Sequence, residues 1–245
     1  MGVKELGEVS RVNSCVGAVD RLLALSQGTK INQASQEWRH DGLCQNFEHP
    51  IAKCDLCTDQ SLRFTFLIQN TVTGQKAWVG DKCLLALGIP IYQSRVRIPQ
   101  HRARQHLAAQ VQDLVTNQAL SVCTMSAFDK ADIALADALI QFRFNGRATI
   151  QEASLIFAAI EQNMLLTTDV MLPIYTRRDE DIAQLRDIPT WALWRFWHCL
   201  TPDQVKLAVS LGHAEPKVQH GTLVKYQRKT DLAHLPRRRQ RDLNE

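Results

Sequence analysis

The stretch that decides the fold begins with Cys54-Asp55-Leu56-Cys57 and ends with Val79-Gly80-Asp81-Lys82-Cys83. Between these motifs, residues 62–68 (LRFTFLI) place Leu62, Phe64, Phe66 and Ile68 on one face, which is typical of a half-buried strand. Residues 70–74 have the composition of a turn, and residues 75–79 can return as a second strand. The sequence therefore predicts a β-hairpin with cysteines at both of its ends.

The spacing of these cysteines indicates a metal site. A two-residue spacer lets the thiolates of a Cys-x-x-Cys pair face one point, as a tetrahedral zinc ion requires, and the hairpin can bring Cys83 back to the pair. A closed site needs a fourth ligand, for which Cys44 is the best candidate and His49 and Asp81 are competitors. An iron–sulfur cluster also accepts four cysteines, so the spacing leaves the identity of the metal open. We predict a structural Zn²⁺ site with the ligands Cys44, Cys54, Cys57 and Cys83.

The remaining cysteines have a different pattern. The chain has seven cysteines, and Cys15, Cys123 and Cys199 stand alone in apolar surroundings. In a reducing compartment, clustered cysteines indicate metal ligands, whereas single ones are usually small core side chains. We expect these three to be buried core residues.

The charge of the chain is unevenly distributed. The net charge is +4 over 245 residues, but residues 82–112 contain five Lys/Arg and no acid, and residues 217–241 contain eight Lys/Arg and one acid. Basic stretches on an otherwise acidic protein indicate a polyanionic partner, although a solvated or salt-bridged face has the same composition. The candidate nucleic-acid contacts are Lys82, Arg95, Arg97, Arg102, Arg104, Lys225, Arg228, Lys229, Arg237, Arg238 and Arg239.

The pattern after residue 99 is helical almost throughout. Residues 101–117 have apolar side chains at helical spacing, and Thr149 with Glu152 and Thr201 with Gln204 have the spacing of helix starts. The fold class is therefore α+β, a small zinc-stabilised β-hairpin module followed by a mainly α-helical domain. We divide the chain into an N-terminal helical segment (1–37), a zinc-binding module (38–92), a helical domain (93–216) and a basic, partly disordered tail (217–245).

Several function classes lack support in the sequence. No apolar run is long enough to span a bilayer and the N-terminus lacks the apolar core of a signal peptide, so we expect a cytoplasmic protein without a membrane partner. No P-loop, GxSxG or HExxH motif is present, and we expect no enzymatic activity. Residues 191–198 (WALWRFWH) are interpreted as an aromatic helix packed in the core, with a base-stacking platform as the alternative.

The cysteine region resembles a known zinc module. The Cys54/Cys57 pair, the strand 64–70, Thr73-Gly74 and residues 79–83 resemble a Cys-x-x-Cys, hairpin, Val-Gly-x-x-Cys module of phage and plasmid proteins. The order of a four-cysteine module and a helical domain is similar to the large-subunit-like zinc proteins of type IV CRISPR effector complexes. This resemblance implies an antiviral-defence subunit at one end of a guide-RNA complex, in contact with a short flanking DNA motif.

Two functions are therefore carried forward. The first is a non-catalytic, zinc-stabilised subunit of a nucleoprotein assembly, with DNA, guide RNA and other subunits as partners. The alternative is a mobile-element adaptor or regulator whose zinc module binds a partner protein.

Overall fold

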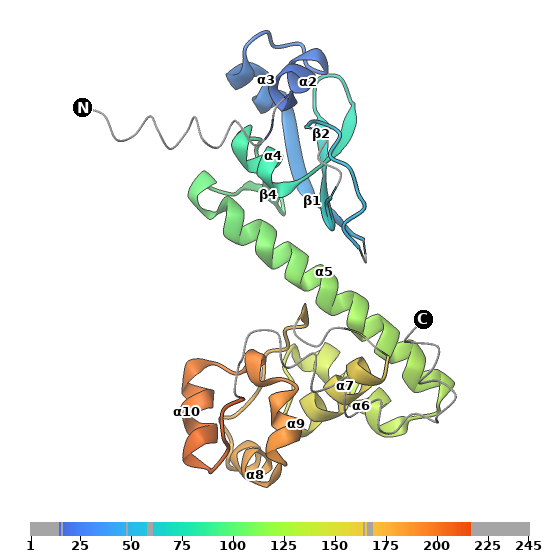
Figure 1. Cartoon of the computed structure of the whole chain (residues 1–245), viewed down its shortest axis with the longest axis vertical. Coiled ribbons are helices and arrows are strands. Elements are labelled where there is room, and N and C mark those ends of the chain that lie inside the picture. Colours follow the sequence, from blue (N-terminus) through green and yellow to red (C-terminus); the bar gives the residue numbers. More distant parts are fainter. Residues whose placement is uncertain are drawn as a thin grey trace, which may run out of the picture.

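The computed structural model describes residues 15, 17–47, 49–57, 61–163, 165 and 169–216. These residues form two lobes that are joined by the long helix α5 (Gln100–Asp129), as Figure 1 shows. The predicted fold class is confirmed, because a small antiparallel sheet with a cysteine cluster precedes a mainly helical region. None of the described helices combines the length and the apolarity needed to cross a membrane.

The N-terminal lobe is built around a three-stranded antiparallel sheet in the order β1-β2-β3. The predicted hairpin is present as β2 and β3, and β1 is a third strand that the sequence pattern did not indicate. The elements of this lobe are α2 (Ala18–Ala24), α3 (Ile31–Glu37), β1 (Trp38–Asn46), β2 (Phe64–Asn70), β3 (Lys76–Val79), α4 (Asp81–Ala86), β4 (Tyr92–Gln93) and β5 (Val96–Arg97).

Local side-chain chemistry sets the register of the β2–β3 hairpin. Phe66 and Ile68 are buried, as the alternating pattern predicts, and they pair with Val79 and Ala77 on β3. At the turn, Asn70 Oδ1 accepts hydrogen bonds from the backbone amides of residues 72 and 73 at 2.8 and 3.0 Å. This side chain therefore takes the place of a backbone acceptor and fixes the point at which the chain reverses.

Strand β1 contains a bulge that interrupts its alternation. His40 pairs with Ile68 and Cys44 pairs with Phe66, so β1 has two more residues than β2 between the same two pairs. Gly42 lies within the bulge at φ 97°, a left-handed conformation that glycine adopts without strain. A bulge bends its strand and redirects neighbouring side chains, and here Asp41 is left exposed at the surface.

The C-terminal lobe consists of short helices that start at clear local signals. Capping boxes are present at Thr149/Glu152 and Thr201/Gln204, as predicted, whereas the helix predicted over 101–117 continues to Asp129 as α5. The elements are α6 (Ile133–Asn145), α7 (Ile150–Gln162), α8 (Asp179–Asp187), α9 (Thr190–Trp194), η3 (Trp197–Cys199) and α10 (Pro202–Ser210).

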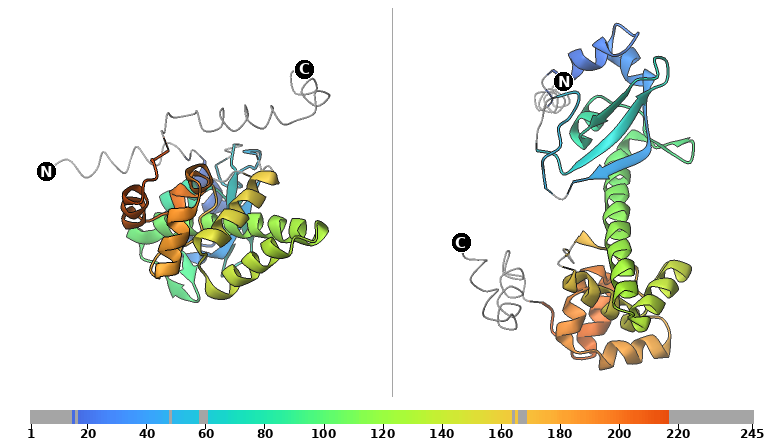
Figure 2. Two further views of the ribbon diagram at one scale, coloured as in Figure 1. Left: turned by 90° about the horizontal axis from the view of Figure 1, so that it is seen from below. Right: turned by 90° about the vertical axis from the view of Figure 1, so that its right-hand side faces the viewer.

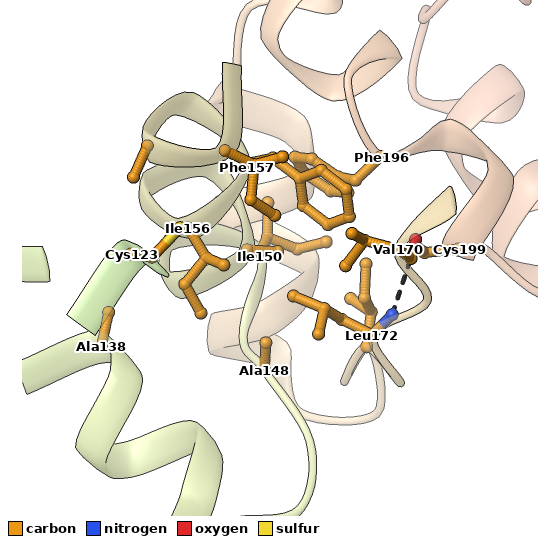
Figure 3. Close-up of a cluster of buried hydrophobic side chains, with 14 of the residues drawn as sticks. Cys123, Ala138, Ala148, Ile150, Ile156, Phe157, Val170, Leu172, Phe196 and Cys199 are labelled. Carbon is orange, nitrogen blue, oxygen red and sulfur yellow. Dashed lines mark hydrogen bonds between the residues drawn. The ribbon is translucent and has the colours of Figure 1, made fainter. Parts of the chain in front are cut away.

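The core of this lobe is aliphatic and aromatic (Figure 3). The rings of Phe157 on α7 and Phe196 stack at a centroid distance of 5.7 Å. Cys123 and Cys199 are buried in the same core, which confirms the expectation for these two single cysteines. Burial raises the pKa of both thiols to about 11, so they remain protonated at neutral pH.

The interpretation of residues 191–198 as one helix packed in the core is wrong in part. Helix α9 ends at Trp194, and the indole of Trp191 is 60% exposed, with the Arg195 guanidinium 4.8 Å from its ring centroid. The buried residues of the run are spread along it, since Leu193 on α9 and Phe196 after it are both fully buried. The helix breaks before the run of aromatic residues is complete, and so these residues do not share one face.

Helix α5 belongs to both cores. Ala103 and Leu107 pack in the N-terminal lobe, and residues 119–127 contribute to the core of the C-terminal lobe. The lobes also contact each other directly, because the guanidinium of Arg63 on the β2 side forms an ion pair with Asp169 at 2.9 Å. The two lobes are therefore held in a fixed arrangement by a shared helix and by polar contacts beside it.

Candidate metal centre

The Cys54–Cys57 pair lies on a tight turn that is held from two directions. The backbone N–H of Asp55 donates to the carbonyl of Trp78 on β3 at 2.9 Å, and a carboxylate oxygen of Asp55 accepts from the N–H of Trp78 at 2.6 Å. Arg21 on α2 donates to the carbonyl of Asp55 at 3.0 Å. The turn is thus attached to both the sheet and a helix, which fixes the direction of its two thiols.

Cys83 comes to this turn from the first residues of α4. Strand β3 ends at Val79, and Gly80 then leads directly into the helix, where Cys83 is buried. A Cβ atom on Gly80 would lie 3.2 Å from a methyl carbon of Leu62, so a larger residue here would require the Leu62 side chain to shift. The hairpin therefore returns Cys83 to the Cys54–Cys57 pair, as the sequence predicts.

The fourth cysteine of the cluster is Cys15. Its sulfur lies 3.2 Å from that of Cys83, and the sulfurs of Cys15, Cys57 and Cys83 are all within 4.8 Å of one another. Cys54 joins them through a hydrogen bond between its sulfur and that of Cys83. None of the four cysteines is in a disulfide bond, since 3.2 Å is well beyond the ~2.05 Å that such a bond requires. The four sulfurs could hold a metal ion, since a tetrahedral ion with bonds of about 2.3 Å separates its sulfur ligands by about 3.8 Å.

Cys44, predicted as the fourth ligand, lies elsewhere. It pairs with Phe66, which in turn pairs with Val79, so two inter-strand steps of about 4.8 Å each separate Cys44 from the strand that leads to Cys83. The Cys44 sulfur instead faces α5, at 4.0 Å from the carbonyl of Gln110, and burial raises its pKa. The competitors His49 and Asp81 are exposed and are not part of the cluster.

Cys15 was missed because it is 39 positions before Cys54 and has no cysteine partner nearby in the sequence. Its place in the cluster follows from the docking of α2 on the sheet, where Leu22 is fully buried. Residues 14–27, within the predicted N-terminal helical segment, have apolar side chains at helical spacing, which is typical of a helix that docks on a neighbouring surface. A helix that docks on the lobe of the Cys54–Cys57 pair brings the residues just before its start close to that pair, and this was the available signal.

Hydrogen bonds polarise the cluster in favour of a thiolate. The pKa of Cys54 falls to about 5, because Cys83 donates to its sulfur and the backbone amides of Gly80, Cys57 and Leu56 do so as well. The pKa of Cys83 is raised, because its thiol donates to the neighbouring sulfurs and is buried. A buried thiolate surrounded by thiols is a site to which a divalent cation is attracted.

The predicted nucleic-acid contacts divide into two groups. Lys82 on α4, Arg95 and Arg97 at the β4–β5 hairpin, and Arg102 and Arg104 on α5 are all exposed. Within the described part of the chain, none of these five forms an ion pair, and the first turn of α5 contains no acid. The other predicted contacts lie outside the described residues; they are Lys225, Arg228, Lys229, Arg237, Arg238 and Arg239.

Comparisons with known proteins gave no relative of this chain. No family model matches it, and no match was found among curated proteins or solved structures. The cysteine cluster and the exposed cations are therefore the features from which a function can be inferred.

Proposed function

We propose that this chain is a non-catalytic, zinc-stabilised subunit that binds nucleic acid within a larger assembly. The observation that supports the proposal most directly is the set of five exposed cations that have no acidic partner among the described residues, on the lobe that contains the cysteine cluster. The cluster would stabilise the lobe, and the cations would contact the phosphates.

Zinc is the metal that fits the donor set best. Four sulfur ligands are typical of structural zinc sites, and a fourth protein ligand leaves no open position for a reacting water. A small lobe buries too little apolar surface to be very stable, and zinc contributes about 10–16 kcal/mol to the folding of small zinc modules. Elemental analysis of the purified protein tests this directly: about one zinc per chain supports the proposal. Iron with visible absorption would instead indicate an iron–sulfur cluster.

The positions of the cations favour a phosphate ligand. Arg102 lies in the first turn of α5, where the positive end of the helix dipole disfavours another positive charge. A bound phosphate relieves this conflict, because helix N-termini and guanidinium groups both prefer anions. Arg95 and Arg97 are close in sequence to this turn, so several phosphates of one strand could be contacted along the same lobe.

The test compares two variants with the same change in charge. One neutralises the five cations of the N-terminal lobe, and the control neutralises five exposed cations of the C-terminal lobe, which are Lys130, Arg143, Arg177, Arg186 and Lys206. Binding of labelled single-stranded DNA, duplex DNA and RNA is measured by fluorescence anisotropy at several salt concentrations. Each lost phosphate contact lowers the slope of log affinity against log salt by about 0.7–0.9. We expect a large decrease in affinity and slope for the first variant only; equal binding by both variants would overturn the proposal.

The outer face of α6 supports the role of a subunit. Leu135 and Leu139 face the core, yet Ile133, Ile140 and Phe144 on the other side are 83%, 62% and 87% exposed. A helix that is apolar on both sides is usually covered on both sides, and so this face favours a protein partner. The same observation supports the alternative function of an adaptor.

Purification from the native host separates these alternatives. Ile140→Asp with Phe144→Asp should leave nucleic-acid binding by the isolated chain unchanged and remove stoichiometric partners. A guide RNA among those partners would support the predicted CRISPR role, whereas a protein partner without RNA would support the adaptor. A wild-type chain that purifies alone would contradict both.

A further inference from the structure

A shallow hollow on the N-terminal lobe lies between two irregular segments of backbone. Its volume is about 560 Å³, and its lining residues are Arg39, Asp41, Tyr92, Ser94 and Arg95. One wall is β1 at the start of its bulge, and the other is the β4–β5 hairpin, which projects beside the start of α5 (Figure 2, right). The two walls are joined where the backbone N–H of His40 donates to the carbonyl of Pro90 at 2.9 Å.

The turn of the β4–β5 hairpin is occupied by unfavourable residues. Ser94 and Arg95 are the two residues between the strands, and both have positive φ, at 48° and 71°. A two-residue turn with this backbone strongly prefers Asn-Gly, because side chains with a Cβ are strained in the left-handed region. Residues held in such conformations concentrate at sites of function. The sequence therefore retains a hydroxyl and a guanidinium where a more stable turn was available.

The polar groups of the hollow are mostly donors without acceptors. Among the described residues, Arg95 has no ion pair, and the hydroxyls of Tyr92 and Ser94 have no hydrogen-bond partner. Arg39 is paired through its Nε with Asp41 at 2.7 Å, and both side chains are 48% exposed. Two guanidinium groups and one carboxylate give the hollow a net charge of +1. One phosphodiester group neutralises this charge, which is too small to balance the negative charge of a free nucleoside triphosphate.

From this arrangement we propose that the hollow is a subsite for one backbone phosphate of a nucleic-acid strand. This inference rests on the proposed function. The guanidinium of Arg95 takes the phosphate oxygens in the two-pronged geometry that arginine favours. Arg39, oriented by Asp41, and the hydroxyl of Ser94 complete the donors around the same phosphate. Tyr92 presents an aromatic surface beside it, on which a neighbouring sugar or base can pack.

The turn permits a test in which the variant folds better than the parent. Ser94→Asn with Arg95→Gly creates the preferred turn sequence and removes the proposed phosphate ligand. We expect its melting temperature to rise by about 2–4 °C, because left-handed strain is relieved. Its affinity for a labelled 20-nucleotide single-stranded DNA should fall about tenfold to a hundredfold, as for the loss of one charged hydrogen-bonding group. Lys130→Gln, which removes one exposed charge from the other lobe, should bind like the parent.

The outcomes separate this proposal from the broader one. If the parent binds the DNA and the variant with Ser94→Asn and Arg95→Gly binds it equally well, the subsite is wrong and the proposed function stands. If the parent binds no nucleic acid, the proposed function fails and the subsite fails with it. Thymidine monophosphate serves as the second probe: Arg95-dependent binding of this nucleotide without binding of the strand would show a small-molecule site and overturn the assignment to a strand.

Discussion

Replacing Cys15 by serine tests the assignment of the metal centre most sharply. The structure places the Cys15 sulfur 3.2 Å from that of Cys83, whereas the sulfur of Cys44 faces the carbonyl of Gln110 on α5. Cys15→Ser should therefore weaken metal binding strongly, and Cys44→Ser, which removes the same atom from a partly buried cysteine, is the matched control.

The size of the effect follows from the number of ligands. If the ~10–16 kcal/mol that zinc gives to small modules is shared equally by four thiolates, each contributes about 2.5–4 kcal/mol. A loss of this size weakens zinc binding by about two to three powers of ten. It should also lower the melting temperature of the N-terminal lobe by about 10–30 °C, since 1 kcal/mol corresponds to about 4–8 °C for a unit of this size. Cys44→Ser should cost about 1 kcal/mol and leave the metal bound.

The assay is competition for zinc with a chromophoric chelator, followed by thermal unfolding of each variant. We expect one zinc per chain in the parent and in Cys44→Ser, and loss of zinc to the chelator in Cys15→Ser. The reverse result, with zinc retained by Cys15→Ser and lost by Cys44→Ser, would refute the assignment. Retention by both variants would refute it as well, because a site of four thiols cannot lose one without a measurable change in affinity.

Three further predictions concern stability. Thr149→Ala removes the cap of α7, including the hydrogen bond that the backbone N–H of Glu152 donates to the Thr149 hydroxyl. It should lower the free energy of unfolding by about 1 kcal/mol in urea titrations. Burial and the neighbouring His40 lower the pKa of His106 below its ordinary 6.5, so the unfolded chain binds the proton more readily and stability should fall as the pH drops below about 6.5. His106→Gln should reduce this fall between pH 7.5 and 5.5, and an unchanged pH dependence would exclude the role of His106. Removal of the metal by a strong chelator should expose residues 17–97 to limited proteolysis while the helices α6–α10 stay protected, and equal cleavage of both lobes would contradict a local role of the metal.

Local patterns in the sequence were sufficient for much of the fold. The β2–β3 hairpin follows from alternation and from a turn whose first side chain, that of Asn70, accepts the hydrogen bonds, and the starts of α7 and α10 follow from three-residue capping signals. In each case the interactions that decide the structure are made within a few residues of each other. Such features need no knowledge of the tertiary structure.

The features that were missed depend on contacts between distant segments. Strand β1 does not alternate, because its bulge at Gly42 shifts the pattern partway along the strand. The choice between Cys15 and Cys44 depends on the order of the strands, which no spacing in the sequence encodes, and on the place where α2 docks, for which the spacing of residues 14–27 indicates only the helix. For the same reason the Arg95 turn was recognised as basic, but its proximity to Arg39 was not expected.

Because α5 is a structural part of both lobes, the chain cannot be divided into two folded fragments in a loop before or after this helix. A fragment ending at residue 92 would lack Ala103 and Leu107, whose side chains complete the apolar packing of the first lobe. A fragment beginning at residue 93 would carry those two side chains as uncovered apolar surface. Separate production of the halves therefore requires a boundary inside α5, after Val111 and before Ala119, so that each fragment keeps the turns of the helix that pack in its own core.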